Sequence, residues 1–158
     1  MKALVSKLSV RLLFKQIKLV TVESCTGGLI GKTLTDMSGS SDWYEGGFIT
    51  YSNRAKICLV NVPVDLIEKY GAVSEEVAEA MAKGAVQHFP ECASVAVTGI
   101  AGPGGGSEEK PVGTVCIASH YKQETKVRKF AFAGNREDIR NETVKEAINL
   151  ILSMDLKK

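Results

Sequence analysis

The sequence is short of the features that mark several specialised classes of protein. Its 158 residues include 2 histidines, 4 cysteines, 4 prolines and 1 tryptophan, and aromatic residues make up 6%. Its apolar runs are far shorter than the roughly 18 residues that a membrane-spanning helix needs. Lysine and arginine number 20 against 18 acidic residues, so the formal net charge is only +2. We therefore expect no membrane segment and no nucleic-acid partner, because phosphate-binding domains usually carry a basic excess.

The cysteines give no sign of a metal site. They are widely spaced and contain no CxxC pair, so a zinc cluster is not expected. Hydrophobic residues make up 44% and charged residues 24%, which is ordinary for a globular protein. A chain of this size can bury a core without disulfides. We predict a single domain over residues 1–158, reduced thiols and a cytoplasmic location.

The first 22 residues are basic and contain no acid. This composition fits an organelle presequence, but Leu4, Leu8 and Leu12 also repeat at the spacing of one helix face. We favour a first helix, because the segment leads directly into a short apolar run typical of a buried strand.

Strand and helix patterns alternate along the rest of the chain. The predicted strands cover Leu19–Val22, Phe48–Ser52, Ser94–Val97 and a hairpin of Val112–Tyr121 with Lys126–Phe132. The first two predicted helices cover Thr26–Met37 and a segment that is capped by Asn53 and ends before Pro63. The third is capped by Ser74, and its inward face consists of Val77, Met81, Ala85 and Phe89. The fourth is capped by Asn135, and its inward face consists of Ile139, Thr143, Ala147, Ile148 and Ile151. This order predicts a three-layer α/β/α sandwich with a mixed, mostly parallel sheet and a C-terminal hairpin plus helix.

Ser24 lies where the first strand gives way to a helix, and Gly27 and Gly28 follow it. N–H groups at a helix start can stabilise an oxyanion, so Ser24 is a candidate nucleophile with the N–H groups of Cys25 to Gly27 as donors. The same residues alone favour a simpler role for Ser24 as an ordinary N-cap.

Two other glycine-containing segments suggest phosphate binding. The segment from Thr26 to Thr33 resembles a Walker A loop, but Thr26 stands in place of its first glycine and Lys32 fits a solvated helix, so a nucleoside triphosphatase is disfavoured. The loop from Gly102 to Ser107 has bare backbone that can surround a phosphate or a flat ring, and it can equally be a mobile surface loop.

A serine nucleophile needs a base. His88 and His120 fall away from the expected strand ends, and neither completes a serine–histidine–acid order. Lys56 falls in the first turn of a predicted helix, where the dipole disfavours a cation and partial burial would lower its pKa further. Spacing alone still favours a surface lysine.

Four blocks together resemble the CinA C-terminal domain family. They are Val22–Gly28, Gly47–Asn53 with Lys56, Gly71–Ser74, and Thr98–Pro103 continuing through Lys110–Thr114. The resemblance runs from about Ile17 to the last helix. Asn61 and Cys116 depart from the family pattern, the N-terminal helix is poorly matched, and none of these differences touches the blocks that carry the chemistry.

Stand-alone members of that family are nicotinamide-nucleotide amidases. The resemblance implies hydrolysis of nicotinamide mononucleotide to nicotinic acid mononucleotide and ammonia, in pyridine nucleotide salvage, without metal or cofactor, by a homo-oligomer. It implies Ser24 as nucleophile, Lys56 as base and Tyr51 as a polar helper. It further implies substrate contacts from Thr98 and Arg140, with Arg136 as the second choice for the phosphate. The two glycine-containing segments themselves add Cys25, Thr26, Gly27, Gly28 and Gly102 as candidate substrate contacts.

Two other functions stay open. One is a non-catalytic nucleotide-binding module, against which the presence of Ser24, Tyr51 and Lys56 argues. The other is a partner-binding domain in competence or the DNA-damage response, although the near-neutral charge argues against direct DNA binding.

Overall fold

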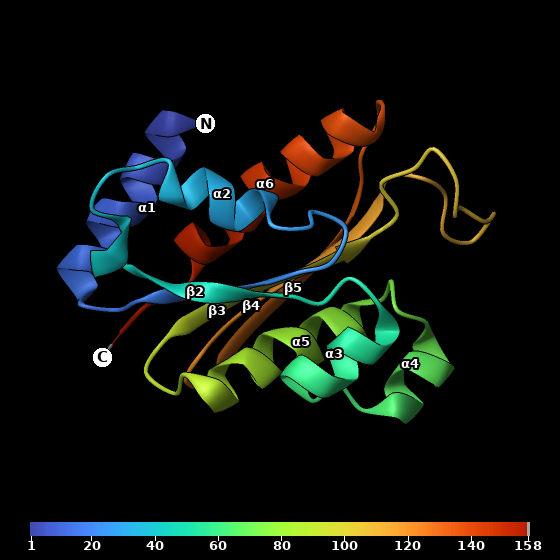
Figure 1. The fold of residues 1–158 in the computed structure, drawn as a ribbon, viewed down its shortest axis with the longest axis horizontal. Coiled ribbons are helices and arrows are strands. Elements are labelled where there is room, and N and C mark those ends of the chain that lie inside the picture. Colours follow the sequence, from blue (N-terminus) through green and yellow to red (C-terminus); the bar gives the residue numbers. More distant parts are fainter. Residues whose placement is uncertain (158) are drawn as a thin grey trace.

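The computed structural model describes residues 1–157 and shows an open five-stranded sheet with helices on both faces (Figure 1). The strands lie in the order β2-β1-β3-β4-β5. Their bounds are β1 Leu19–Glu23, β2 Tyr44–Ile49, β3 Ala93–Gly99, β4 Thr114–Tyr121 and β5 Glu124–Ala131. The helices are α1 Lys2–Lys15, α2 Leu29–Thr35, the 3₁₀ turn η1 Ser40–Asp42, α3 Asn53–Val60, α4 Val64–Tyr70, α5 Glu75–His88 and α6 Arg136–Ser153.

The predicted three-layer sandwich is confirmed. Helices α1, α2 and α6 cover one face of the sheet, and α3, α4 and α5 cover the other (Figure 1). Strand β1 pairs in parallel with both β2 and β3, whereas β4 is antiparallel to β3 and β5. The C-terminal hairpin followed by a helix is also as predicted. The sheet is mixed, but it is not mostly parallel, because two of its strand pairings are parallel and two are antiparallel.

Strand β1 lies between two hydrophobic cores. Leu19 packs into the core under α1, α2 and α6, whereas Val20 and Val22 pack into the core under α3 and α5. All five residues of β1 are buried, because alternate side chains point to opposite faces and each face is covered. The carboxyl end of this central strand is therefore a rigid place for a functional residue.

The N-terminal segment forms the predicted helix. Leu8 and Leu12 of α1 are fully buried and Leu4 packs partly against the same core. The Arg11 guanidinium donates to the carbonyl oxygens of Leu152 and Met154 at the end of α6, where a cation is favoured. Among residues 1–157, no helix has the length and apolar character required to cross a membrane.

Three predicted boundaries near the end of β1 are wrong, and the two hairpin strands begin at Thr114 and Glu124 instead of Val112 and Lys126. Helix α2 begins at Leu29 instead of Thr26, because the φ angles of Gly27 and Gly28 are 56° and 100° and form a turn first. Strand β2 runs over Tyr44–Ile49 instead of Phe48–Ser52, because its register with β1 ends at the Glu23–Ile49 pair. The N-cap of α3 is Ser52 and not Asn53, since the Ser52 hydroxyl accepts the Ala55 N–H at 3.0 Å.

The two long helices of the second half follow their caps. Ser74 accepts the Val77 N–H at the start of α5, and Asn135 forms a capping box with Asp138 at the start of α6. The predicted inward residues are buried, except that Phe89 lies just beyond the end of α5 and is partly buried. Helix α4 and η1 were not predicted.

Candidate active site

Ser24 follows β1 directly and is held in the sheet by its main chain. Its N–H donates to the Val97 carbonyl oxygen of β3 at 3.1 Å, and the residue is 7% exposed. Its hydroxyl oxygen accepts a hydrogen bond from the Lys56 Nζ at 2.9 Å. The N-cap of the following helix is Gly28, so Ser24 is not the N-cap.

Lys56 enters the site from α3, which follows the neighbouring strand β2. The residue is 1% exposed. Besides Ser24, its Nζ donates to the carbonyl oxygens of Thr50 at 2.8 Å and Tyr51 at 3.5 Å. The Thr50 N–H in turn donates to the Glu23 carbonyl oxygen at 2.8 Å, which fastens the end of β2 to the end of β1. The carboxyl ends of two adjacent parallel strands thus bring Ser24 and Lys56 together.

The environment of Lys56 weakens its hold on a proton. Burial lowers the pKa of Lys56 from 10.5 to about 8, because an ammonium loses hydration there. Within residues 1–157, no carboxylate forms an ion pair with this lysine. The neutral amine has two N–H donors, which match the two carbonyl oxygens, and one lone pair, which can accept the Ser24 O–H. This arrangement suits a general base.

The turn after Ser24 is organised by the buried carboxylate of Glu23. This carboxylate accepts the Thr26 hydroxyl at 2.6 Å and the N–H groups of Gly28, Ile30 and Gly31 at 3.0, 3.0 and 2.8 Å. The N–H groups at the start of α2 therefore bind a protein carboxylate and are not free to bind an oxyanion.

The predicted set of oxyanion donors becomes smaller in the structure. The Gly27 N–H donates to the Ser24 carbonyl oxygen at 3.1 Å, so it is engaged. Within the described chain, the N–H groups of Cys25 and Thr26 donate to no oxygen, and the Cys25 N–H lies against its own thiol. These two N–H groups, which follow the candidate nucleophile directly, are the donors that remain.

Tyr51 takes a different position from the one expected for a polar helper. Its side chain is exposed, and its hydroxyl accepts a hydrogen bond from the Arg136 guanidinium at 3.2 Å. Only its carbonyl oxygen reaches Lys56. In this structure the Tyr51 phenol therefore belongs to the rim of the site and not to the Ser24–Lys56 pair.

Both candidate arginines lie on the first turns of α6 and line an open cavity of about 550 Å³. Arg136 also donates to the Gly102 carbonyl oxygen at 2.7 Å, so it joins the glycine-rich loop to Tyr51. Arg140 donates to the Thr26 carbonyl oxygen at 2.7 Å, and its Nε is buried without a partner in the described chain. Arg140 thus supports the turn that carries Ser24.

Thr98 and Gly102 of the glycine-rich loop both make close contacts with other residues of the chain. The Thr98 hydroxyl is buried and donates to the Ala72 carbonyl oxygen at 2.8 Å. Gly102 has a φ of 80°, and a Cβ there would lie 2.5 Å from the Val112 Cγ1. Glycine is required at this position because the loop folds back closely onto Val112.

A model of the CinA C-terminal domain matches residues 1–154. The chain belongs to this family. A CinA-like protein of Geotalea daltonii is 56% identical over 127 residues, which cover 80% of this chain and 31% of that protein. One of Leptospira biflexa is 50% identical over 142 residues, which cover 89% and 34%. The chain therefore spans about a third of the length of the curated relatives it matches.

Solved structures of the CinA superfamily share the fold. A superfamily protein of Escherichia coli has a TM-score of 0.90 and 38% identity, covering 94% of this chain and 87% of that one. The competence/damage inducible protein of Agrobacterium tumefaciens has a TM-score of 0.89 and 38% identity, covering 95% and 94%.

The other motifs of this CinA domain have ordinary structural roles. Lys32 forms an exposed ion pair with Asp36 at 2.6 Å, so the Walker-like segment offers no phosphate loop. His88 is exposed beside Phe48, and the His120 ring bonds to the Thr125 hydroxyl. In the described part of the chain, no group of three or more histidine, cysteine or acidic residues could hold a metal ion.

Sequence reasoning gave no role to Glu23 or Thr50. Glu23 carries a usable signal, because it is an acid at the end of an otherwise apolar buried strand. Thr50 carries no such signal, since it contacts Lys56 and Glu23 through its main-chain carbonyl and N–H groups.

Proposed function

We propose that this CinA domain is a serine/lysine amidase that hydrolyses the carboxamide of nicotinamide mononucleotide. The observation that supports the proposal most is the 2.9 Å hydrogen bond between the Ser24 hydroxyl and a buried Lys56 that no carboxylate neutralises in the described chain. The substrate comes from the family resemblance, which sequence blocks on both sides of the site support.

In the first half of the reaction, neutral Lys56 takes the Ser24 proton while the serine oxygen attacks the amide carbon. The carbonyl oxygen becomes an oxyanion, which the N–H groups of Cys25 and Thr26 stabilise. The Lys56 ammonium then gives its proton to the amide nitrogen, the carbon–nitrogen bond breaks, and ammonia leaves. Ser24 now holds the nicotinoyl group as an ester.

In the second half, a water molecule attacks the ester while Lys56 removes its proton. The collapse of the second tetrahedral intermediate breaks the bond to Ser24, and Lys56 returns a proton to the serine oxygen. The products are nicotinic acid mononucleotide and the free enzyme. One lysine serves as base and acid in both halves, which requires a pKa near the working pH.

We assign the anionic part of the substrate to the cavity lined by Arg136 and Arg140, which the contact of Arg140 with the Thr26 carbonyl connects to the Ser24 turn. Arg136 and Arg140 face it from the first two turns of α6. Removing an arginine that binds phosphate should raise the KM for the mononucleotide about tenfold or more, and change the KM for the dephosphorylated nucleoside much less. Because Arg140 also holds the Thr26 carbonyl, Arg140→Ala should lower kcat as well, whereas Arg136→Ala should act mainly on KM. Equal increases in KM for the mononucleotide and the nucleoside would show that the arginines do not bind the phosphate.

The deciding experiment is ammonia release from nicotinamide mononucleotide by the purified chain, compared with Ser24→Ala. Lys32→Ala is the matched control for folding and surface charge, because Lys32 is exposed and has no proposed role in catalysis. We expect turnover by the parent chain and the control only. No release by a folded parent chain would favour the nucleotide-binding or partner-binding alternative.

A further inference from the structure

Glu23 is a buried carboxylate that makes no ion pair in the described chain. It is 1% exposed, and all of its four side-chain partners are hydrogen-bond donors: the Thr26 hydroxyl and three N–H groups at the start of α2. A buried charge is costly unless it is fully hydrogen-bonded. These donors and the positive end of α2 supply that compensation.

The position of Glu23 links the nucleophile to the following helix. Its main-chain oxygen accepts the Thr50 N–H beside Lys56, and its carboxylate holds Thr26 and Gly28 on the far side of Ser24. The turn from residue 24 to 28 is therefore fixed at both ends by one residue. Within this turn of the described chain, only Cys25 and Thr26 have N–H groups that donate to no oxygen.

We infer that Glu23 is a positioning residue whose carboxylate shapes the oxyanion hole made by the N–H groups of Cys25 and Thr26. The inference rests on the proposed function and deepens it. By binding the donors of α2, Glu23 prevents the turn from winding into the first turn of that helix, in which Cys25 and Thr26 would adopt helical geometry. The same contacts keep the carboxylate away from Lys56, which would hold its proton more tightly beside an acid.

The donor set explains why the side chain must be a glutamate. Glutamine would present an amide N–H to at least one of the N–H groups that now point at the carboxylate, so one buried donor would face another. Aspartate is one methylene shorter and could not reach both Thr26 and Gly31. Glu23→Gln therefore keeps the shape of the side chain but disrupts the hydrogen bonds that we propose position the Cys25–Thr26 turn.

The test measures Glu23→Gln against Glu79→Gln, a matched change in a surface ion pair with Lys83. We expect Glu23→Gln to lower kcat about 10²- to 10³-fold, the usual effect of losing an oxyanion donor. KM and the pH midpoint of kcat/KM should stay close to the parent values, because substrate binding and Lys56 are not the target. A kcat within threefold of the parent, or a loss confined to KM, would overturn the inference.

A second pair of variants keeps the test informative if Glu23→Gln does not fold. Thr26→Val removes the hydroxyl that donates to Glu23 and keeps the side-chain shape. It should lower kcat clearly, and Thr26→Ser, which restores the hydroxyl, should recover most of the loss. Folded Thr26→Val with the kcat of the parent chain would contradict the role of the Glu23–Thr26 contact.

Labelling of Ser24 by a fluorophosphonate separates this inference from the proposed substrate. The probe reacts with an activated serine whatever the natural substrate is, and mass spectrometry locates the label. Slower labelling in Glu23→Gln, with no ammonia released by the parent chain, would support the inference and overturn the proposed amidase. Equal labelling rates in the parent chain and a folded Glu23→Gln, or no labelling of the parent, would overturn the inference.

Discussion

Two charged side chains are buried at the same edge of the sheet, and their surroundings are opposite in kind. Glu23 and Lys56 are each 1% exposed, and each lies near the start of a helix that follows a parallel strand. The Glu23 carboxylate meets only donors and the favourable end of α2. Lys56 is the fourth residue of α3, near the unfavourable end for a cation, and its charge meets only neutral oxygens.

This difference indicates a structural role for the Glu23 carboxylate and a catalytic role for the Lys56 amine. A carboxylate that accepts four hydrogen bonds is held in one position by its donors. A buried ammonium without a counter-charge is poised to lose its proton, and such groups cluster at functional sites. The following predictions change one member of the comparison at a time.

The largest effect should come from replacing Lys56. Lys56→Ala and Lys56→Arg should both lower kcat/KM about 10²- to 10⁴-fold, because a guanidinium keeps the charge but cannot accept a proton at working pH. Ammonia release measures the loss, and Lys32→Arg is the surface control. Substantial activity in Lys56→Arg would show that Lys56 acts by its positive charge and that another group is the base.

The pH dependence should follow Lys56. The free enzyme needs the neutral amine, and the pKa of Lys56 is lowered to about 8, so kcat/KM should rise with pH and level off above that value. Between pH 6 and pH 8 the rise should approach about tenfold per unit, as for a single titrating base. The profile of the parent chain measures the midpoint. A midpoint above 10 would show that Lys56 keeps an ordinary pKa and that burial does not tune it.

The same lowered pKa predicts a gain in stability when the charge is removed. Lys56 has a pKa of about 8 in the folded chain and 10.5 as a free group, so the unfolded state binds more protons between these values. Stability of the parent chain should therefore rise with pH from about 8 to 10.5, and the full penalty is present below pH 8. Lys56→Met should raise the free energy of unfolding by about 1–3 kcal/mol at pH 7, with a smaller gain at pH 10. Urea unfolding at the two pH values measures this, and a constant gain would contradict the electrostatic cause.

The parts of the fold that depend on local signals were predictable from the sequence. Caps at Ser74 and Asn135 fixed the starts of α5 and α6, because each cap satisfies N–H groups only two or three residues away. Strand β2 was shifted in the prediction because Gly46 and Gly47 are poor strand formers. Gly47 lies in the sheet for a tertiary reason, since a Cβ there would be 2.3 Å from the Thr21 hydroxyl.

Some features of the candidate site were likewise predictable from the sequence, and others were not. Ser24 and Lys56 could be selected from motifs and family resemblance, and their common sheet edge follows from parallel strands. The burial of Lys56, its 2.9 Å contact across 32 positions of sequence and the engagement of α2 by Glu23 required the structure. Contacts of this kind depend on the packing of whole elements, which no local pattern records.

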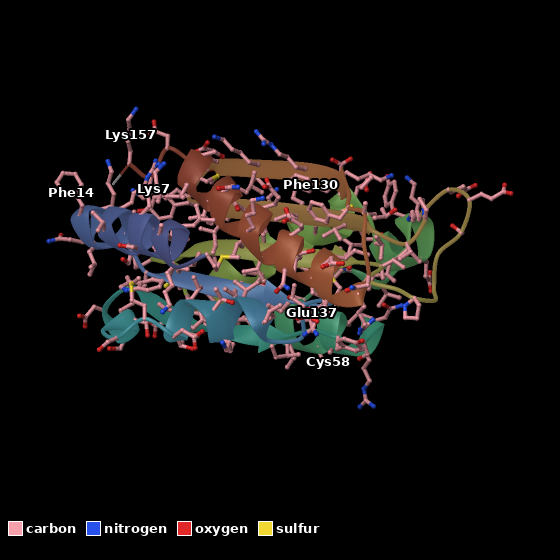
Figure 2. The ribbon with its side chains drawn as sticks, turned by 90° about the horizontal axis from the view of Figure 1, so that it is seen from above. Lys7, Phe14, Cys58, Phe130, Glu137 and Lys157 are labelled. Atoms are coloured by element: carbon pink, nitrogen blue, oxygen red, sulfur yellow. The ribbon has the colours of Figure 1, made fainter. Side chains whose placement is uncertain are left out.

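The smallest effect should come from Cys25, the residue next to the candidate nucleophile. A thiol is intrinsically the better nucleophile, so the choice of Ser24 needs a direct test. Burial raises the pKa of Cys25 to about 12, so its thiolate is scarce at neutral pH, and its proposed contribution is a main-chain N–H that every residue except proline has. Cys25→Ala should therefore keep kcat within about threefold of the parent, whereas Ser24→Ala should lose it by orders of magnitude. Iodoacetamide should label the exposed Cys58 (Figure 2) well before Cys25. Inactivation by the reagent that Cys25→Ala abolishes, together with activity retained in Ser24→Ala, would transfer the role of nucleophile to Cys25.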